Sequence, residues 1–397
     1  MKKSVVTLLI CVCCLTGCQA TPEQVKENKE NYNKNQQIDS VEISRCRVDE
    51  LQNSVEEALK GEYENIVLPE KIDFSKVEEV NEMTFVYAND FLKNKESVGK
   101  TLGYDNLIWE EAQSAVKNER SQIAENLQEK YYIGVGDNGW TTALKGDMYV
   151  KLGEKDSTKV KAVYHIDRGE GLEEECVLNG EKTTIGNQIA YVEEWFQKEW
   201  KQWESDFEYE VGAVVNREDE NGNNILMMEV DRVYGGIVLD PVGGKISYNE
   251  EYTTLESIGS CCLIGLSNKD SWDDFVNGNG LLTVKEKNAQ SEIIDFVSAV
   301  RIVEKELSGF RKLDVSDVKI LYTLKPVYDS TEENANYCEP GGEVYARPVY
   351  SFLIDREYED LGLGTIDLSG MYYFVQVDMI TGEVSINLSA GAYGTQK

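Results

Sequence analysis

The segment Asp-Met-Ile-Thr-Gly-Glu-Val-Ser-Ile-Asn at residues 378–387 carries the pattern of two strands joined by a tight turn. Its Asp can accept hydrogen bonds from backbone amides two or three residues on, and its Gly can take the positive φ that such a turn needs. The segment Asp-Pro-Val-Gly-Gly-Lys-Ile-Ser-Tyr-Asn at 240–249 aligns with it without gaps, and four of the ten positions are identical. The pattern therefore predicts the same turn twice, at Asp240 with Gly244 and at Asp378 with Gly382.

Helix and strand patterns precede both turns in the same order. The two series are a helical pattern at 187–204 with strands at 207–215, 225–233 and 237–239, and a helical pattern at 291–307 with strands at 318–328, 344–354 and 371–379. We therefore expect two tandem modules, each a helix with an antiparallel sheet, at 186–270 and 271–397. Chance agreement is the competing explanation, because strand–turn–strand segments use few residue types.

Residues 46–185 show less regular patterns, and we expect them to form an N-terminal α+β domain. The helical patterns there lie at 48–59 and 107–130, and the strand patterns lie at 83–88, 147–152 and 160–166. The predicted fold class of the whole chain is α+β.

The final turn, which has the form V-D-x-x-T-G-E-V at residues 377–384, resembles the ending of PepSY-type modules. The helix-then-strands layout is also similar to the tandem modules of YycI-like extracytoplasmic regulators. Residues 372–384 match best, and 232–240 (Arg-Val-Tyr-Gly-Gly-Ile-Val-Leu-Asp) correspond to them in the first module. The whole layout resembles bacterial lipoproteins of the clostridial type. The resemblance covers the last half of the chain, and it implies a protein that binds or inhibits partners without catalysing a reaction.

The N-terminus has the pattern of a secretory signal. Lys2 and Lys3 precede a mostly apolar run at 4–16, which is too short to span a bilayer. The run ends in Leu15-Thr16-Gly17-Cys18, which resembles the lipobox of bacterial lipoproteins. That resemblance implies removal of residues 1–17 and acylation of Cys18 with diacylglycerol, followed by further acylation such as palmitate. The alternative is an ordinary signal peptide that contains Cys.

Residues 18–45 are polar and rich in Asn, Glu, Lys and Gln, so they cannot bury enough apolar surface to fold. We expect a flexible tether that reaches about 30 Å from the lipid. Durable anchoring needs more than one acyl chain, so we expect Cys18 to be multiply acylated. The predicted location is the extracytoplasmic face of the cell membrane.

The charge balance excludes several classes of partner. The chain has 40 Lys and Arg against 72 Asp and Glu, which gives a formal net charge of −32. Nucleic acids require a basic footprint, and anionic lipid headgroups attract Lys and Arg, so neither suits this chain. We expect membrane contact through the lipid anchor alone, an envelope protein or peptide as partner, and a monomer.

The cysteines show no metal-binding or redox spacing. Beyond Cys18, the mature chain holds an odd set without a CxxC pair: Cys46, Cys176, Cys261, Cys262 and Cys338. A zinc site would use paired spacings and usually His, and His165 is the one His in the chain. We interpret Cys261 and Cys262 as small apolar residues of a buried strand, with a vicinal disulfide as the alternative. The sequence allows one disulfide among Cys46, Cys176 and Cys338 and does not select the pair.

The candidate catalytic motifs are weak. Ser-x-x-Lys occurs at 97–100 and 316–319, but the companion motifs of penicillin-recognising enzymes are missing. An EF-hand template centred on Gly222 would put Arg217 and Met228 at positions that require carboxylates. We therefore expect no cofactor and no metal, and we interpret 218–222 as a solvated hairpin tip.

Aromatic residues follow one face of the helical pattern at 187–204. Val192, Phe196, Trp200 and Trp203 fall at core spacing, whereas Trp195 lies off this stripe and is the weak candidate for a ligand face. Three glutamates lie nearby, at Glu193, Glu194 and Glu199, but glutamates on one helix usually face water.

The function predicted from the sequence is a lipid-anchored envelope lipoprotein with a non-enzymatic binding or regulatory role. The first alternative is a solute- or glycan-binding lipoprotein that uses exposed aromatic side chains. The last is an envelope hydrolase that uses two converging carboxylates, which must face each other across a substrate bond.

Overall fold

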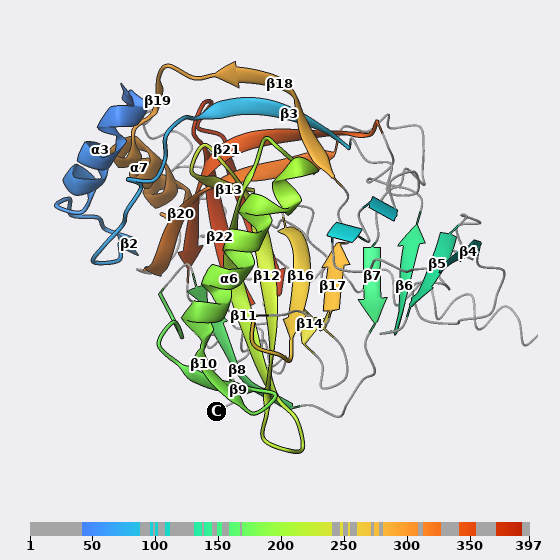
Figure 1. Cartoon of the computed structure of the whole chain (residues 1–397). Helices are drawn as coiled ribbons and strands as arrows, with labels where there is room; N and C mark the ends of the chain where they lie inside the picture. Colours follow the sequence, from blue (N-terminus) through green and yellow to red (C-terminus); the bar gives the residue numbers. More distant parts are fainter. Residues whose placement is uncertain are drawn as a thin grey trace, which may run out of the picture.

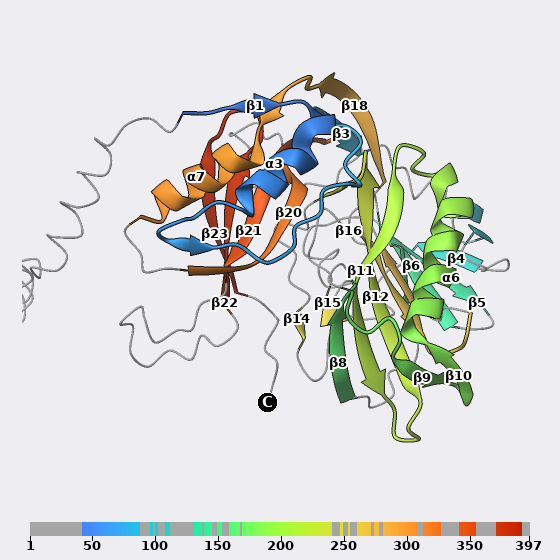
Figure 2. The ribbon, with the colours of Figure 1, turned by 90° about the vertical axis from the view of Figure 1, so that its left-hand side faces the viewer.

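The computed structural model describes residues 42–87, 96–97, 100–101, 108–111, 131–136, 139–144, 149–152, 159–166, 169–239, 247–248, 253–254, 260–270, 274–277, 281–308, 313–326, 341–354 and 371–390. These residues form a mixed structure of α-helices and β-strands that is dominated by sheet. Two sheets lie side by side; one α-helix covers a face of the first, and two cover a face of the second (Figures 1 and 2).

The first sheet is antiparallel throughout, and its longest strands, β11 and β12, lie toward one edge. Its strands, in order across the sheet, are β4 (Ile108–Glu111), β5 (Tyr131–Gly136), β6 (Gly139–Leu144), β7 (Tyr149–Leu152), β17 (Asp274–Asn277), β16 (Ser260–Leu266), β12 (Asn224–Tyr234), β11 (Glu208–Glu218) and β8 (Lys159–His165). The β11–β12 hairpin closes as predicted at Gly222, which has a φ of 80°. Asp219 Oδ1 accepts hydrogen bonds from the backbone N–H of Asn221 and of Asn223, both at 2.8 Å.

Helix α6 (Ile185–Lys198) covers this sheet (Figure 2). Thr184 caps it, because its Oγ1 accepts a hydrogen bond from Asn187 N at 3.2 Å. The predicted helix ran on to residue 204, but the α-helix ends at Lys198 and a 3₁₀ turn, η3 (Trp200–Gln202), follows. The tighter turn lets Trp200 stay fully buried while the chain turns toward β11.

The second sheet is built on the long hairpin of β20 (Leu313–Pro326) and β21 (Glu343–Ile354). The free edge of β21 is shared by two partners. Residues 343–346 pair with β3 (Asn81–Tyr87), which continues to β18 (Leu282–Ala289), and 349–354 pair with β22 (Met371–Asp378), which continues to β23 (Val384–Ala390). Helices α3 (Leu51–Ala58) and α7 (Phe296–Glu306) pack together on this sheet (Figure 2).

Helix α7 begins later than the predicted start at 291. Residues 293–294 form the short strand β19 (Ile293–Ile294) instead, which pairs with β1 (Arg45–Cys46). Asp295 then caps the helix, because its Oδ1 accepts a hydrogen bond from Ser298 N at 2.7 Å. The helical spacing of Ile293 and Ile294 is therefore incidental, and both side chains reach the core from a strand.

Strand β13 (Ile237–Leu239) joins the two sheets. It leaves β12 through a tight turn at Gly235 and Gly236, whose φ values are 57° and 78°. It then pairs in parallel with β20, with Val238 opposite Leu321. A Cβ on Gly236 would lie 1.9 Å from the carbonyl oxygen of Lys76, so no other residue fits there.

The predicted N-terminal domain, 46–185, contributes to both sheets. Its early part, with β1, η1 (Val48–Glu50), α3, β2 (Ile66–Val67) and β3, belongs with the second sheet, and β2 pairs in parallel with β20. Its later part, from β4 to β8, belongs with the first sheet. The hairpin of β9 (Glu175–Leu178) and β10 (Glu181–Thr184) leads into α6, and β14 (Ser247–Tyr248) pairs with β15 (Thr253–Thr254).

The helix predicted at 107–130 is wrong at its start. Residues 108–111 form β4, which pairs along its whole length with β5. A β-branched and an aromatic residue, Ile108 and Trp109, open this strand, and the ladder with β5 outweighs the weak helical spacing. Residues 112–130 lie outside the described residues.

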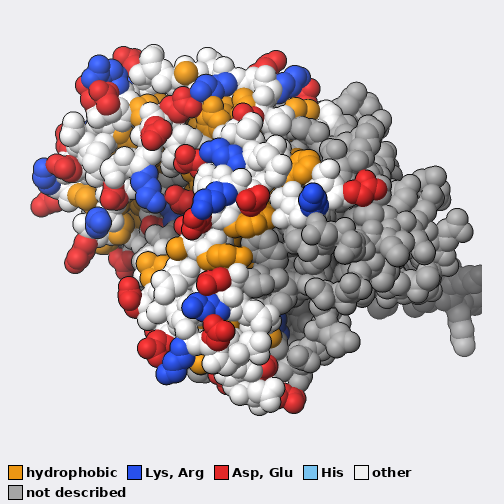
Figure 3. Space-filling view, in the orientation of Figure 1, with side chains coloured by type: hydrophobic (Ala, Val, Ile, Leu, Met, Phe, Trp, Pro, Cys, Tyr) orange, Lys and Arg blue, Asp and Glu red, His pale blue; other side chains and the backbone are white. Residues whose placement is uncertain are grey.

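Within the described ranges, no helix is long and apolar enough to cross a membrane. Acidic and basic side chains are interspersed over the face in Figure 3, so the surplus of acid is not collected into one patch in that view.

Candidate functional site

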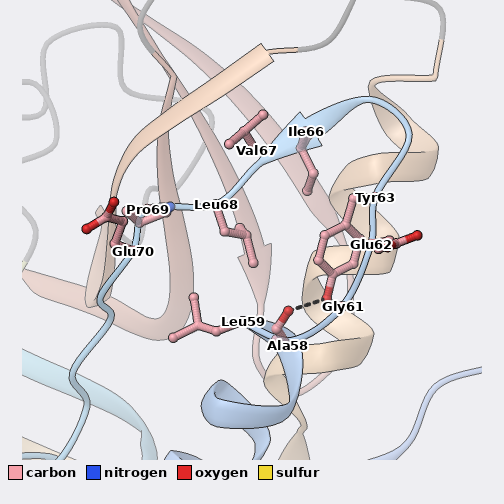
Figure 4. Close-up of a pocket in the computed structure, with 10 residues that line it drawn as sticks. All are labelled: Ala58, Leu59, Gly61, Glu62, Tyr63, Ile66, Val67, Leu68, Pro69 and Glu70. Atoms are coloured by element: carbon pink, nitrogen blue, oxygen red, sulfur yellow. Dashed lines mark hydrogen bonds between the residues drawn. The ribbon is translucent and has the colours of Figure 1, made fainter.

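A surface cleft of about 500 Å³ lies where α3 ends and the chain continues to β2. We call it the α3–β2 cleft; its lining residues are Ala58, Leu59, Gly61, Glu62, Tyr63, Ile66, Val67, Leu68, Pro69 and Glu70. In Figure 4 the side chains of Leu59, Tyr63 and Leu68 all border it. Its volume falls in the range of ligand-binding pockets, so it is the candidate binding site.

Tyr63 forms one wall of the cleft and is held in place. Its hydroxyl donates a hydrogen bond to the carbonyl oxygen of Ala58 at 3.0 Å (Figure 4). A Cβ at Gly61 would lie 2.7 Å from the same hydroxyl, so the ring packs directly over the Gly61 backbone. Burial raises the pKa of Tyr63, and nearby Arg301 opposes that shift. The hydroxyl therefore stays protonated and keeps its bond to the helix end.

Residues 44–46 are fixed to the second sheet although the predicted tether extended to 45. Ser44 N donates to Ser298 Oγ at 2.9 Å, and Asp295 N donates to the carbonyl oxygen of Ser44 at 3.1 Å. Arg45 Nη2 donates to the carbonyl oxygen of Ile380 at 2.6 Å. We call these contacts the N-terminal clamp; they place the end of the predicted tether beside the start of α7 and the turn after β22.

That turn is the predicted one at Asp378 and Gly382. Asp378 Oδ1 accepts hydrogen bonds from Ile380 N at 2.9 Å and from Thr381 N at 2.8 Å. Gly382 has a φ of 76° and donates to the carbonyl oxygen of Asp378. The second predicted turn is confirmed, whereas Asp240 and Gly244 lie outside the described residues.

The other carboxylate oxygen of Asp378 takes part in an ion-pair cluster. Arg347 Nη1 lies 2.9 Å from Asp378 Oδ2 and 3.8 Å from Glu383, and Arg347 Nη2 lies 3.8 Å from Glu82. Tyr345 donates its hydroxyl to Glu82 at 2.7 Å, and it raises the pKa of Arg347 by a hydrogen bond. Arg347 thus stays charged and holds β3, β21 and the turn together.

A second ion pair, between Glu204 and Arg232, is entirely buried, and sequence reasoning missed it. Both side chains have no exposed surface, and Arg232 contacts Glu204 through Nε at 3.0 Å and Nη2 at 2.8 Å. Glu204 also accepts hydrogen bonds from Leu282 N at 2.6 Å and from Tyr209 at 3.1 Å, and the Trp200 indole donates at 3.3 Å.

Through these contacts the pair of Glu204 and Arg232 links four elements, η3, β11, β12 and β18. The available signal was a lone Arg among the apolar residues of β12, which needs a buried anion opposite it. Which acid supplied that anion depended on packing between distant segments.

The aromatic stripe is core, as predicted. Val192, Phe196 and Trp200 are fully buried, and Trp203 is half-buried against them. Trp195 is also half-buried, with its ring 5.1 Å from that of Phe196. These indoles do not form an open stacking platform.

The three glutamates of the helix do not converge. Glu193 accepts a hydrogen bond from Val211 N at 3.0 Å, and burial raises its pKa. Glu194 is exposed and pairs with Lys198, one turn along the helix, and Glu199 is exposed.

Cys176 and Cys262 are buried, and Cys46 is half-buried. Burial raises the pKa of Cys46 and of Cys176 to about 11, and both thiols are free. Cys262 is buried in β16, as expected for the apolar interpretation. The lipobox residues Leu15, Thr16, Gly17 and Cys18 lie outside the described residues, as does Cys338.

The remaining motifs have structural roles. Ser316 and Lys319 lie on β20 and not one helical turn apart, and Ser316 Oγ donates a hydrogen bond to the carbonyl oxygen of Leu353 at 3.3 Å beside a β-bulge. The backbone N–H of His165 donates to Glu170 at 3.0 Å at the end of β8. Among the described residues, no group of three or more His, Cys, Asp or Glu is arranged to hold a metal ion.

No family model and no curated protein matches the chain. Among solved structures, the chain is similar to an uncharacterized protein from Eubacterium rectale, with 11% identity, a TM-score of 0.49, and coverage of 84% of this chain and 98% of that one. That likeness carries no inference about the site, which is interpreted from its own residues.

Proposed function

We propose that the protein is a lipid-anchored, extracytoplasmic binding or regulatory protein, attached to the cell membrane through Cys18. The lipobox at 15–18 and the polar stretch after it support the anchor. The folded part would then stand off the bilayer on a tether of roughly 25 residues, about 30 Å in reach.

The single observation that carries the proposal is the N-terminal clamp. A tethered protein needs a defined point at which a flexible segment becomes folded. Here the contacts of Ser44 and Arg45 supply that point, because three hydrogen bonds and the pairing with β19 hold two consecutive residues against α7, β19 and the turn after β22. The anchor would therefore connect directly to the second sheet.

The order of elements supports the finer proposal of tandem PepSY-like modules. Helix α6 precedes β11, β12 and β13, and helix α7 precedes β20, β21 and β22, in both cases as an antiparallel meander. The last strand of each series ends at one of the two matching segments of sequence, at residues 240 and 378. A duplication would produce this correspondence.

The roles of the charged groups support binding over catalysis. Glu204 and Arg232 are enclosed and form an ion pair, and the partly exposed Arg347 is held by Asp378 and Glu82. These groups stabilise the sheets, whereas the α3–β2 cleft is open to another molecule.

Partition between detergent and water tests the anchor. The full chain, expressed in a bacterial host, is extracted and separated into Triton X-114 and aqueous phases, with labelling by radioactive palmitate. We expect the labelled protein in the detergent phase, and we expect Cys18→Ala to move it to the aqueous phase without label. Cys46→Ala, which removes a thiol outside the lipobox, is the matched control and should partition like the parent. An unlabelled parent chain in the aqueous phase would refute the proposal.

A further inference from the structure

The α3–β2 cleft is lined by apolar side chains together with a comparable area of polar surface, and it is partly open to solvent. Leu59, Tyr63, Leu68 and Pro69 are half-buried, and Val67 is 40% exposed, which makes it one of the most exposed large apolar side chains described. Apolar surface left open in a concave site favours an apolar group of a partner.

The ends of the cleft are acidic. Glu62 and Glu70 lie at opposite sides of it, with their carboxylates directed outward (Figure 4). Both are exposed, and neither makes an ion pair within the described part of the chain. The nearby Lys71 is directed elsewhere, with its Nζ 3.9 Å from Asp73. Two uncompensated carboxylates flanking these apolar side chains complement a ligand that is apolar in the middle and basic at both ends.

The strand beside the cleft favours an extended polypeptide as that ligand. Ile66 and Val67 form β2, which pairs on one side with β20 and has no second neighbour among the described strands. An unpaired edge offers backbone N–H and C=O groups to an added strand. In such a strand the side chains at positions i, i−2 and i+2 point to the same face. The side chain at i would reach the apolar side chains of the cleft, and those at i−2 and i+2 would reach the two acids.

We propose that the α3–β2 cleft binds an extended segment of a partner protein, with an apolar side chain seated on Leu59, Tyr63 and Leu68 and basic side chains paired with Glu62 and Glu70. The proposal deepens the proposed function, on which it rests for a polypeptide partner. An anionic lipid or nucleic acid surface does not fit these acids.

Fluorescence anisotropy tests this with the soluble chain, residues 18–397 carrying Cys18→Ala, so that the result does not depend on lipid anchoring. The probe is a fluorescein-labelled nonapeptide with Leu at its centre and a Lys or Arg two residues away on each side. A second peptide with Glu in place of the basic residues serves as the charge-reversed probe. We expect saturable binding of the basic probe, and binding of the acidic one weaker by more than about tenfold.

Three variants locate the binding. The pair Glu62→Gln with Glu70→Gln should weaken the basic probe about tenfold, because it removes two surface ion pairs. The pair Glu173→Gln with Glu181→Gln makes the same charge change on exposed acids far along the chain, and it should leave the affinity unchanged. Val67→Ser, at a position that is 40% exposed, should weaken binding severalfold.

Equal loss of affinity in the two double variants would overturn the proposal, because it would mean attraction to the overall negative charge. Absence of saturable binding would overturn it as well. Tighter binding by a chain that begins at residue 42 would show that the protein's own tether occupies the cleft, which also contradicts a partner segment. None of these outcomes changes the detergent partition of the anchored protein, so the two proposals fail separately.

Discussion

Removing the negative charge of Glu204 should cost a large part of the stability of this fold. The Glu204→Gln variant takes away the carboxylate that contacts the Arg232 guanidinium through Nε and Nη2, in a site where neither side chain has exposed surface. Breaking such a buried pair costs about 3–5 kcal/mol, because the remaining charge stays desolvated after this contact is lost. The contacts with Leu282 N and Tyr209 weaken at the same time, since an amide oxygen is a poorer acceptor than a carboxylate.

The assay is urea unfolding followed by tryptophan fluorescence, for which Trp200 beside the pair is a local reporter. With a slope of about 3 kcal/mol per molar urea, the loss corresponds to a midpoint lower by about 1 to 1.7 M. The exposed pair of Glu194 and Lys198 provides the matched control, and Glu194→Gln should move the midpoint by less than about 0.3 M.

A double variant distinguishes a charge effect from a packing effect. Glu204→Leu with Arg232→Met replaces both charges by apolar groups, and it should recover at least half of the loss, because neither charge then remains alone. The reasoning is refuted if Glu204→Gln behaves like the control at Glu194, or if the double variant is less stable than either single one.

Three smaller effects follow from the second sheet. Gly382→Ala should lower the free energy of unfolding by about 1 kcal/mol, because its φ is 76° and a Cβ there lies 3.1 Å from Ile294; an unchanged urea midpoint would contradict this. Asp295→Ala should cost about 1 kcal/mol by removing the cap on Ser298 N, whereas Asp295→Asn should cost much less. Cys46, whose pKa burial raises from 9.0 to about 11, should react with iodoacetamide at pH 8 about 100-fold more slowly than an unstructured cysteine; peptide mapping that finds equal rates would disprove it. Because the folded thiol keeps its proton to the higher pH, its contribution to stability is present below pH 9 and is lost as the pH rises to about 11.

Local patterns were enough to predict the long strands that follow α6 and α7, and the turn at Asp378. The alternation in 225–233 and 344–354 and the Asp and Gly of the turn act over a few residues, and β12, β21 and the turn lie where these patterns put them. The limits of the helices were less accurate. Trp200 keeps helical spacing inside a 3₁₀ turn, and Ile293 keeps it inside a strand, because both side chains reach the core from more than one backbone conformation.

Local patterns did not predict the long-range pairings. The sequence at 81–87 does not indicate its pairing with residues 343–346, and the sequence around Glu204 does not indicate its ion pair with Arg232. Both depend on the register of strands that are distant in the sequence. The α3–β2 cleft was missed for the same reason, since its floor is closed by α3 and β2 only after both pack on the second sheet.

The distribution of β1, β2 and β3 has a consequence for how this chain can be divided. A fragment that begins at residue 271 lacks β1, β2 and β3, which pair with its own β19, β20 and β21. A fragment that ends at residue 270 lacks β20, with which β13 pairs. Neither half can therefore be exchanged or inherited by itself without leaving unpaired sheet edges open to aggregation. The smallest unit that recombination could pass on intact runs from the N-terminal clamp to β23.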